Sequence, residues 1–318
     1  MAKGLVVLVG IVLLNFLMIR LAPGDPAAVM AGEAGASDET YVRQLRQQFG
    51  LDQPLPVQLW KYAANIAQLD LGHSYRQQRP VAEILGEKLG PTLMLTGTAF
   101  LVSLVLGVAL GILAARKAGR WSDSLITVLA LFFYAMPLFW VGLMGIVLFS
   151  VTLGWLPAFG MRSVGLRLTG FEAALDVARH LVLPATTLAL FHLASYARMM
   201  RASIVEVQDL DFVRTARAKG VPESRILRVH VLRNALLPVV TIAGVKAGYL
   251  IGGSIVVETV FAWPGIGRVA YEAVLQRDYN VLLGVFLVTS AMVIAFNLIT
   301  DLVYTVVDPR IEMGARAA

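Results

Sequence analysis

The sequence predicts an all-α integral membrane protein with six transmembrane helices and an extracytoplasmic loop region between the first two. Of its 318 residues, 58% are hydrophobic and 15% are charged, whereas soluble domains contain about 25% charged residues. The mean hydropathy is +0.72. The chain also contains six apolar runs of about the length that a helix needs to cross a bilayer. Together these observations exclude a soluble enzyme, a disordered protein and a nucleic-acid binder.

The six apolar runs are, in order, residues 5–19, 92–115, 125–161, 181–197, 235–257 and 281–300. The first is short and follows Lys3, so it also fits the core of a signal peptide. Because no Ala-x-Ala-like cleavage site follows it closely, an uncleaved span is favoured. The third run is long enough for one span and a membrane-associated loop that contains Trp155 and Pro157.

The distribution of basic residues predicts that both termini are cytoplasmic. Eight Lys and Arg residues fall in the segment 198–234, which lies inside in this orientation. The net charge of +6 is then explained by basic cytoplasmic loops. We expect three parts: an N-terminal span and extracytoplasmic loop region at 1–90, a five-helix core at 91–310 and a cytoplasmic tail at 311–318.

The sequence contains no signature of an enzyme that acts alone. It has no cysteine, and its four histidines do not follow a metal-binding spacing, so no metal site is expected. No phosphate-binding P-loop occurs. The stretch 265–270 matches a dinucleotide-binding pattern, but it lies in a predicted outer loop without the required strand and helix. We therefore expect no cofactor bound by this chain.

The cytoplasmic loop 198–234 is predicted to contain two helices separated by a break. Asp211 is expected to cap a short helix, and Gly220 is expected to end it because glycine tolerates a positive φ. Pro222 suits the first turn of a second, basic helix over 223–233. This arrangement indicates a shaped surface. The alternative is a basic loop that only orients the protein.

The fifth span contains three glycines at four-residue intervals and one charge. Gly244, Gly248 and Gly252 predict a face for close helix packing, although glycine is common in membrane helices generally. Lys246 lies two residues from two of these glycines, about 200° around the helix, so it should point away from them. An ammonium group in mid-span costs at least about 2.5–3.5 kcal/mol if it faces lipid. It should therefore meet a polar cavity or a carboxylate.

Motifs along nearly the whole chain resemble the ABC importer permeases of the dipeptide, oligopeptide and nickel family. The segments that carry the resemblance are Pro23–Pro26, Gly50–Pro54, Asp70–Ser74, Arg79–Val81, Arg214–Gly220, Arg233–Pro238, Gly252–Glu258, Phe261–Arg268, Asn297–Asp301 and Asp308–Arg310. Each motif is modest alone, and their order makes the resemblance specific. Arg214, Thr215 and Ala216 stand where this family has Glu-Ala-Ala.

The resemblance implies the fold of a type I ABC importer permease in a bacterial or archaeal cytoplasmic membrane. It implies a second homologous permease, two ATP-binding subunits that use ATP and Mg²⁺, and an extracytoplasmic substrate-binding protein. The coupling to these ATPases is expected through loop 211–230, with its centre at Arg214, Thr215, Ala216, Arg217, Ala218, Lys219, Gly220 and Val221. An outer gate loop would contain Glu258, Trp263, Pro264 and Gly265.

Three side chains are candidates to line the translocation pathway: Lys246, His192 and Ser195. For Lys246 the alternative is a structural ion pair, for example with the partner permease. For His192 and Ser195 the alternative is polar packing. Peptides are the expected substrate, and nickel or a metal chelate is the alternative within the family. A secondary transporter or channel is the alternative from another class, but no inverted repeat is visible.

Overall fold

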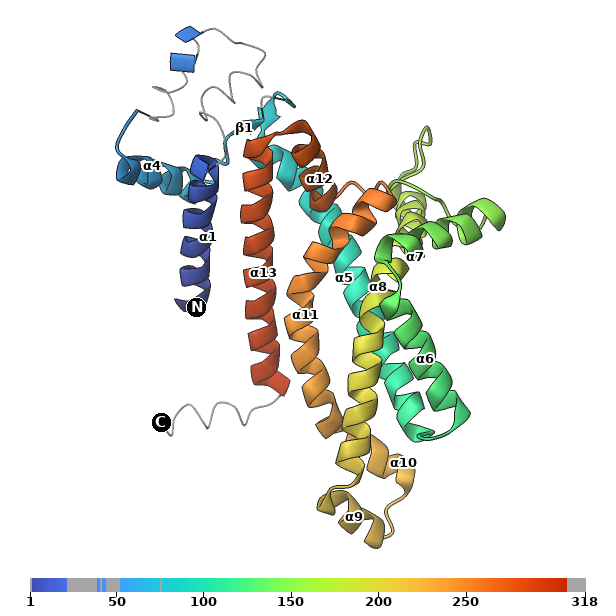
Figure 1. Ribbon diagram of the computed structural model, residues 1–318. Helices are drawn as coiled ribbons and strands as arrows, with labels where there is room; N and C mark the ends of the chain where they lie inside the picture. The colour runs from blue at the N-terminus through green and yellow to red at the C-terminus, as the bar shows by residue number, and fades with distance from the viewer. Residues whose placement is uncertain (1, 22–38, 41, 44–51, 75, 308–318) are drawn as a thin grey trace. The chain divides into compact units, whose positions relative to one another are not determined.

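The computed structural model describes residues 2–21, 39–40, 42–43, 52–74 and 76–307. Most of these residues are helical (Figure 1). The chain divides into two compact units, one formed by 1–92 with 264–294 and the other by 93–263 with 295–318. The division passes through two long helices, α5 (Val81–Arg116) and α13 (Tyr279–Val307).

Within the described residues, four helical segments are long and apolar enough to cross a membrane: Val81–Arg116, Gly170–Gln208, Glu223–Gly248 and Tyr279–Thr300. A bent pair, Trp121–Ala135 with Leu138–Thr152, makes a fifth if it forms one span. A further helix, α1 (Ala2–Leu21, 20 residues), coincides with the first predicted span. The helical membrane architecture predicted from the apolar runs is confirmed.

The third apolar run does not form one straight span followed by a loop. It forms α6 (Trp121–Ala135), α7 (Leu138–Gly145) and the π-helix η1 (Ile146–Thr152), with a bend of 104° at the break. The break lies at Met136 and Pro137, both extended, because proline removes a backbone donor and disfavours helix in the residue before it.

The larger unit is organised around α8 (Gly170–Gln208), which packs against α6, α7 and α11 (Leu232–Val260). With 39 residues, α8 is much longer than the predicted span 181–197. It continues through its own Pro184 and beyond the apolar run at both ends. Hydropathy along the sequence therefore predicts only the middle of this helix, because its two ends are more polar.

Two hydrophobic clusters hold this unit together. The first joins α8 to the connection between α8 and α11 and includes Tyr196, Met200 and Ile204, none of which is exposed. The second joins α5, α7, α8 and the end of α11 around Leu188 and Trp263, both fully buried. Alanine and valine are the most frequent buried members of these two clusters, and small side chains let helices in a membrane approach closely.

The smaller unit contains α4 (Leu55–Ala67), a two-stranded hairpin, α12 (Ile266–Gln276) and the first part of α13. Strands β1 (His73–Ser74) and β2 (Arg79–Pro80) pair antiparallel. The buried hydroxyl of Ser74 donates to the carboxylate of Asp278, which directly precedes α13. This hydrogen bond ties the hairpin to the α12–α13 turn.

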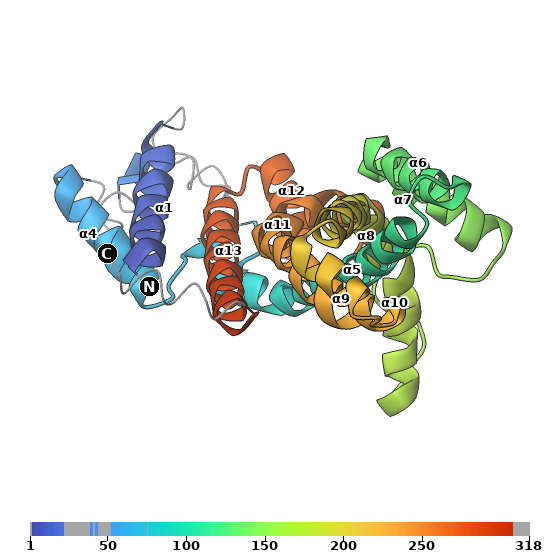
Figure 2. The same ribbon diagram turned by 90° about the horizontal axis from the view of Figure 1, so that it is seen from below.

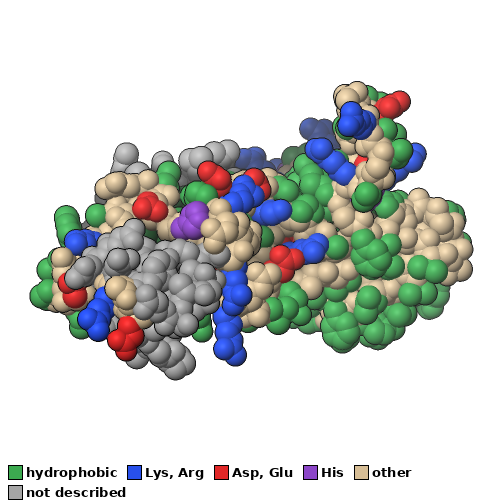
Figure 3. All heavy atoms as spheres, turned by 90° about the horizontal axis from the view of Figure 1, so that it is seen from above, with side chains coloured by type: hydrophobic (Ala, Val, Ile, Leu, Met, Phe, Trp, Pro, Cys, Tyr) green, Lys and Arg blue, Asp and Glu red, His purple; other side chains and the backbone are tan. Residues whose placement is uncertain are grey.

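Several predictions for the N-terminal loop and the tail fall outside the described residues. These are the motif at 23–26, the motif at 308–310 and the tail 311–318. On the face drawn in Figure 3, the described basic and acidic side chains are interspersed and do not gather by sign.

Candidate functional site

The connection between α8 and α11 begins with α9 (Asp211–Ala218), a short helix that buries only two side chains. These are Val213 and Ala216, which lie three residues apart and so on the same helix face. Leu210 supplies the N-cap position, and Asp211 is the first helical residue with no side-chain cap hydrogen bond. The prediction that Asp211 is the cap was therefore wrong by one residue.

Gly220 ends α9 in a Schellman motif. Its φ is +74°, in the left-handed region that glycine adopts without a steric penalty. The N–H of Val221 donates to the carbonyl of Ala216, and the N–H of Gly220 donates to that of Arg217. Val221 also packs with Ala216 in the same cluster, which is the hydrophobic contact expected of this motif. The predicted stop at Gly220 is confirmed as a turn.

The second predicted helix, 223–233, is not a separate element. A short helix α10 (Glu223–Arg225) follows Pro222 and continues through the π-helix η2 (Ile226–Val231) directly into α11. Arg217 of α9 donates from Nε to Glu223 Oε1 at 2.8 Å across the turn. The basic segment is therefore the beginning of a long helix, and α9 is fastened to it.

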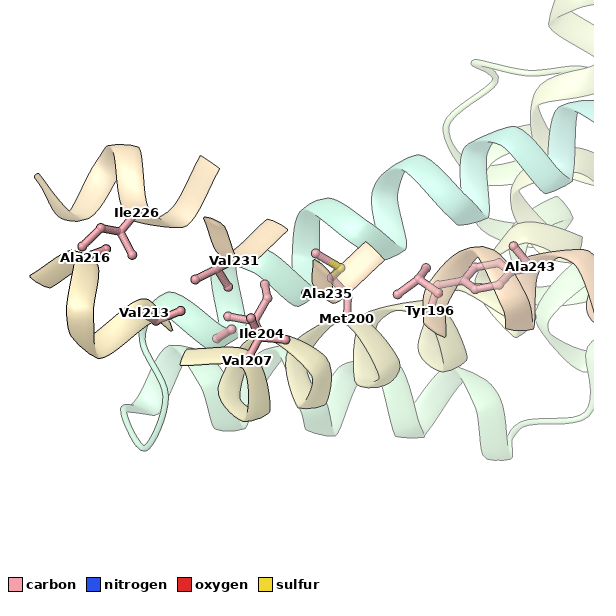
Figure 4. Packing of buried hydrophobic residues seen from close by; sticks show 12 residues of the cluster. Tyr196, Met200, Ile204, Val207, Val213, Ala216, Ile226, Val231, Ala235 and Ala243 are labelled. Carbon is pink, nitrogen blue, oxygen red and sulfur yellow. The ribbon is translucent and has the colours of Figure 1, made fainter. Parts of the chain in front are cut away.

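The connection is packed firmly onto the end of α8 (Figure 4). The sticks show Val213, Ala216 and Ile226 next to Val207 and Ile204 in one continuous cluster. Viewed from that end, α9 and α10 lie beside the ends of α8 and α11 (Figure 2). The exposed residues of α9 and its turn are Asp211, Phe212, Arg214, Thr215, Arg217, Ala218, Lys219 and Gly220. α9 therefore exposes most of its side chains and packs on the unit through Val213 and Ala216.

Lys246 lies at the middle of α11, 14 residues from either end, and forms a hydrogen bond with a side chain of α8. Its Nζ donates to Ser195 Oγ at 2.6 Å. The expectation that it points away from Gly244 agrees with this contact, because Gly244 lies against Thr300 of α13 instead. His192, one turn before Ser195, is buried and its Nδ1 has no hydrogen-bond partner among the described residues.

The glycines of α11 differ in their surroundings. A Cβ on Gly244 would lie 1.8 Å from Thr300 Cγ2, so this glycine permits a close helix approach. Gly248 is buried. Gly252 is exposed, and a Cβ there would meet nothing within 4 Å. The three glycines therefore do not share one packing contact among the described residues.

A second glycine pair, which the sequence analysis did not single out, also permits a close helix crossing. Cβ atoms on Gly107 and Gly111 of α5 would lie 2.7 Å from Tyr196 Cβ and 2.6 Å from the Ala197 carbonyl oxygen of α8. The four-residue spacing of this pair within an apolar run was the signal available in the sequence.

An ion pair between a buried carboxylate and a partly exposed arginine joins α6 to α8. Arg201 donates from Nε and Nη2 to the two carboxylate oxygens of Asp123, at 2.6 and 2.7 Å. The N–H of Gly119 donates to the same carboxylate. Asp123 is 4% exposed. Charge patterns in the sequence do not reveal this pair, because its members are 78 residues apart.

Two of the predicted gate residues, Glu258 and Trp263, are fully buried in the larger unit. The N–H of Trp263 donates to the carbonyl of Glu258 at 2.8 Å, closing a turn in which Ala262 has a φ of +50°. The N–H of Gly160 donates to the carbonyl of Phe261. Trp263 thus anchors this turn in the core of the unit.

The other two predicted gate residues, Pro264 and Gly265, begin the second segment of the smaller unit. Gly265 is the N-cap of α12, and the N–H of Ile266 donates to Thr92 Oγ1. Gly267 is buried within α12. Residues 265–270 were predicted to lie in an outer loop, whereas residues 266–276 form an amphipathic helix.

These features define a helical membrane protein in which a short helix, α9, connects two long helices. The chain belongs to the family described as "Binding-protein-dependent transport system inner membrane component", whose model matches residues 107–313. The N-terminal model of the same system matches residues 1–96.

Two relatives match over most of their length. A Brucella abortus (strain 2308) protein named for a peptide transport system permease is 40% identical over 98% of this chain and 96% of its own. The glutathione transport system permease protein GsiC of Escherichia coli O6:H1 is 42% identical over 94% of this chain and 92% of its own.

Solved structures share the fold at low sequence identity. An inward-facing MetNI methionine ABC transporter chain has a TM-score of 0.56 and 19% identity, covering 71% of this chain and 96% of its own. A chain of an amino acid ABC transporter has a TM-score of 0.51 and 15% identity, covering 70% and 93%. These likenesses establish the type I importer permease fold.

Proposed function

We propose that this chain is a permease subunit of an ATP-driven importer that moves peptides across the cytoplasmic membrane of a bacterium or archaeon. The substrate class rests on the two relatives, which are named for peptide and glutathione transport and are at least 40% identical to this chain. Family membership supports the remaining components. These are a second homologous permease, two ATP-binding subunits that hydrolyse ATP with Mg²⁺, and an extracytoplasmic binding protein.

The observation that supports coupling to ATPases is the construction of the α8–α11 connection. α9 projects an exposed face but is anchored by Val213, Ala216 and the Arg217–Glu223 ion pair. A rigid element of this kind transmits rigid-body motion without absorbing it in local bending. We propose that residues 211–230, centred on Arg214–Val221, dock in a groove of an ATPase subunit. Both termini are then cytoplasmic, as the basic loops indicate.

The pathway and gate assignments also belong to this proposal. Lys246, Ser195 and His192 would line the pathway between permease subunits, and the Glu258–Gly265 segment would lie at its outer end. Gly252, with open space in this chain, suits packing against the second permease.

The test is copurification of the chain, solubilised in detergent, with the products of its neighbouring genes, followed by an ATPase assay in lipid. We expect a second permease and two P-loop subunits to copurify, and the binding protein to stimulate ATP hydrolysis. Phe212→Asp places a charge on the exposed face of α9 and should reduce ATPase capture about tenfold or more, a loss of at least about 1.4 kcal/mol.

Leu275→Asp on α12 is the matched control, because Leu275 is also an exposed apolar residue on a helix outside the connection. It should leave ATPase capture unchanged. A chain that purifies alone and transports or conducts without ATP would contradict the importer assignment. Equal capture by the Phe212→Asp variant and the wild type would contradict the docking role of α9.

A further inference from the structure

Two cations lie near each other on the apolar helices α8 and α11 without a carboxylate. Lys246 Nζ donates to Ser195 Oγ at 2.6 Å. Arg198 lies three residues after Ser195 on α8, and therefore on the same face of that helix. Among the described residues, neither cation lies within 4.0 Å of an acidic oxygen.

The guanidinium of Arg198 is held in place by an aromatic stack. It lies 5.4 Å from the ring centroid of Tyr134 on α6, within the range of a cation–π interaction. Tyr134 in turn stacks on Phe191 of α8, with centroids 5.4 Å apart. Among the residues that the structure describes, the guanidinium makes no hydrogen bond or ion pair, so its N–H donors are available for a ligand.

The available donors are those that recognise a carboxylate. The ammonium group of Lys246 has three donors, of which Ser195 takes one. Guanidinium groups bind carboxylates through two parallel hydrogen bonds. The mid-span ammonium group of Lys246 is costly without a counter-charge, and Arg198 adds a second positive charge on the face of α8 that carries Ser195. A bound anion would offset both charges.

We propose that Lys246, Ser195 and Arg198 form a binding site for a carboxylate group of the transported substrate. This inference rests on the proposed function and adds to it a substrate class, peptides that carry a free carboxylate. Ser195 holds the ammonium group in place, and the Tyr134–Phe191 stack holds the guanidinium. His192, buried one turn before Ser195, adds a polar side chain on the same side of α8.

The first experiment measures the protection of Lys246 from an amine-acylating reagent in the complete transporter, with labelled lysines quantified by peptide mass spectrometry. The probes are glutathione, which has two carboxylates, and its diamide, which has none. We expect glutathione to slow the labelling of Lys246 several-fold and the diamide to leave it unchanged. Lys117, exposed in the turn after α5, is the internal control and should label equally in all samples.

The second experiment measures glutathione uptake by proteoliposomes that contain the complete transporter and loaded binding protein. Lys246→Met should lower uptake about tenfold or more while binding-protein-stimulated ATP hydrolysis stays within about twofold of the wild type. Lys246→Arg should retain most of the uptake because the positive charge remains. Arg198→Met should also lower uptake, and Lys117→Met should not.

If glutathione does not slow the labelling of Lys246 in a transporter that imports glutathione, the carboxylate site is overturned and the proposed function stands. Complete resistance of Lys246 to the reagent would also overturn it, because a ligand could not reach the site. Full uptake by both the Lys246→Met and Arg198→Met variants would do the same. If the wild type shows neither uptake nor stimulated ATP hydrolysis with any peptide, the proposed function itself fails. The labelling assay needs no variant, so misfolding of one cannot obscure the answer.

Discussion

Arg201 of α8 forms a bidentate ion pair with the buried carboxylate of Asp123 at the beginning of α6. The pair lies seven residues before the end of α8, from which α9 follows. It therefore joins α6 to the part of α8 that carries the connecting helix. The carboxylate also accepts from the Gly119 N–H, so its hydrogen-bonding capacity is largely used.

Breaking this pair from one side should destabilise the chain more than removing an exposed ion pair. Arg201→Met leaves a buried carboxylate uncompensated, and we expect a loss of roughly 3 kcal/mol in the free energy of unfolding. The measurement is thermal or denaturant unfolding of the purified chain in a defined detergent. Arg214→Met, which removes an exposed arginine with only a 3.9 Å contact, is the control and should cost well under 1 kcal/mol. Equal losses in both variants would show that the Asp123 pair is not structural.

Because Gly220 has a positive φ in the Schellman turn, we expect this position to tolerate asparagine better than valine. Gly220→Val should destabilise the turn by about 1–2 kcal/mol, since a β-branched residue disfavours a positive φ. Gly220→Asn should cost much less, because asparagine visits this region more readily. Nothing lies within 4 Å of a Cβ at this position, so crowding does not explain a difference.

The readout for Gly220 is the stimulation of ATP hydrolysis by the binding protein in the assembled transporter. We expect the valine variant to lose stimulation and the asparagine variant to keep most of it. If both variants were equally active, the shape of the turn would not matter for coupling.

Gly111 and Gly252 should respond oppositely to alanine. A Cβ on Gly111 would lie 2.6 Å from the Ala197 carbonyl oxygen, and backbone cannot move aside cheaply. We expect Gly111→Ala to destabilise the isolated chain by about 1–3 kcal/mol. Gly252→Ala meets open space, so it should be neutral or stabilise the helix by up to about 1 kcal/mol. Unfolding in detergent tests both, and a stable Gly111→Ala variant would rule out the tight α5–α8 crossing.

Replacing Trp263 and replacing Trp155 should have different effects on stability, because only Trp263 is buried. Trp263 is 0% exposed and Trp155 is 67% exposed. Trp263→Ala should cost about 3–5 kcal/mol, because it removes a large side chain from a packed core. Trp155→Ala should cost less than about 1 kcal/mol. The comparison uses thermal unfolding followed by the remaining tryptophan fluorescence, and similar midpoints for the two variants would contradict the packing of Trp263.

Much of the fold was predictable because apolar runs, and the glycine and proline residues that end helices, are local features of the sequence. The end of α9 at Gly220 could be predicted from this one residue, because glycine adopts a positive φ more readily than any other residue. The break at Met136–Pro137 was missed, although Pro137 is visible in the sequence, because the apolar run continues on both sides of it. The helix α12 was missed because a Trp-Pro-Gly turn directly precedes it.

The candidate sites were only partly predictable. Lys246 stood out as a charge in an apolar run, and its direction followed from helical periodicity. Its partner Ser195 lies 51 residues away, and neither Arg198 nor the Tyr134–Phe191 stack carried any local signal. The Asp123–Arg201 pair was invisible for the same reason.

The sequence alone determined that this chain enters a membrane, where its apolar runs lie and where the connecting helix ends, since hydropathy and backbone preferences act over a few residues. Its ordered motifs also indicated the family. Only the tertiary structure decided which glycines permit close helix contact, which tryptophan is buried and which charges meet across helices. The physical reason is that packing and pairing depend on distances between residues far apart in the chain, and those distances exist only after the helices are assembled.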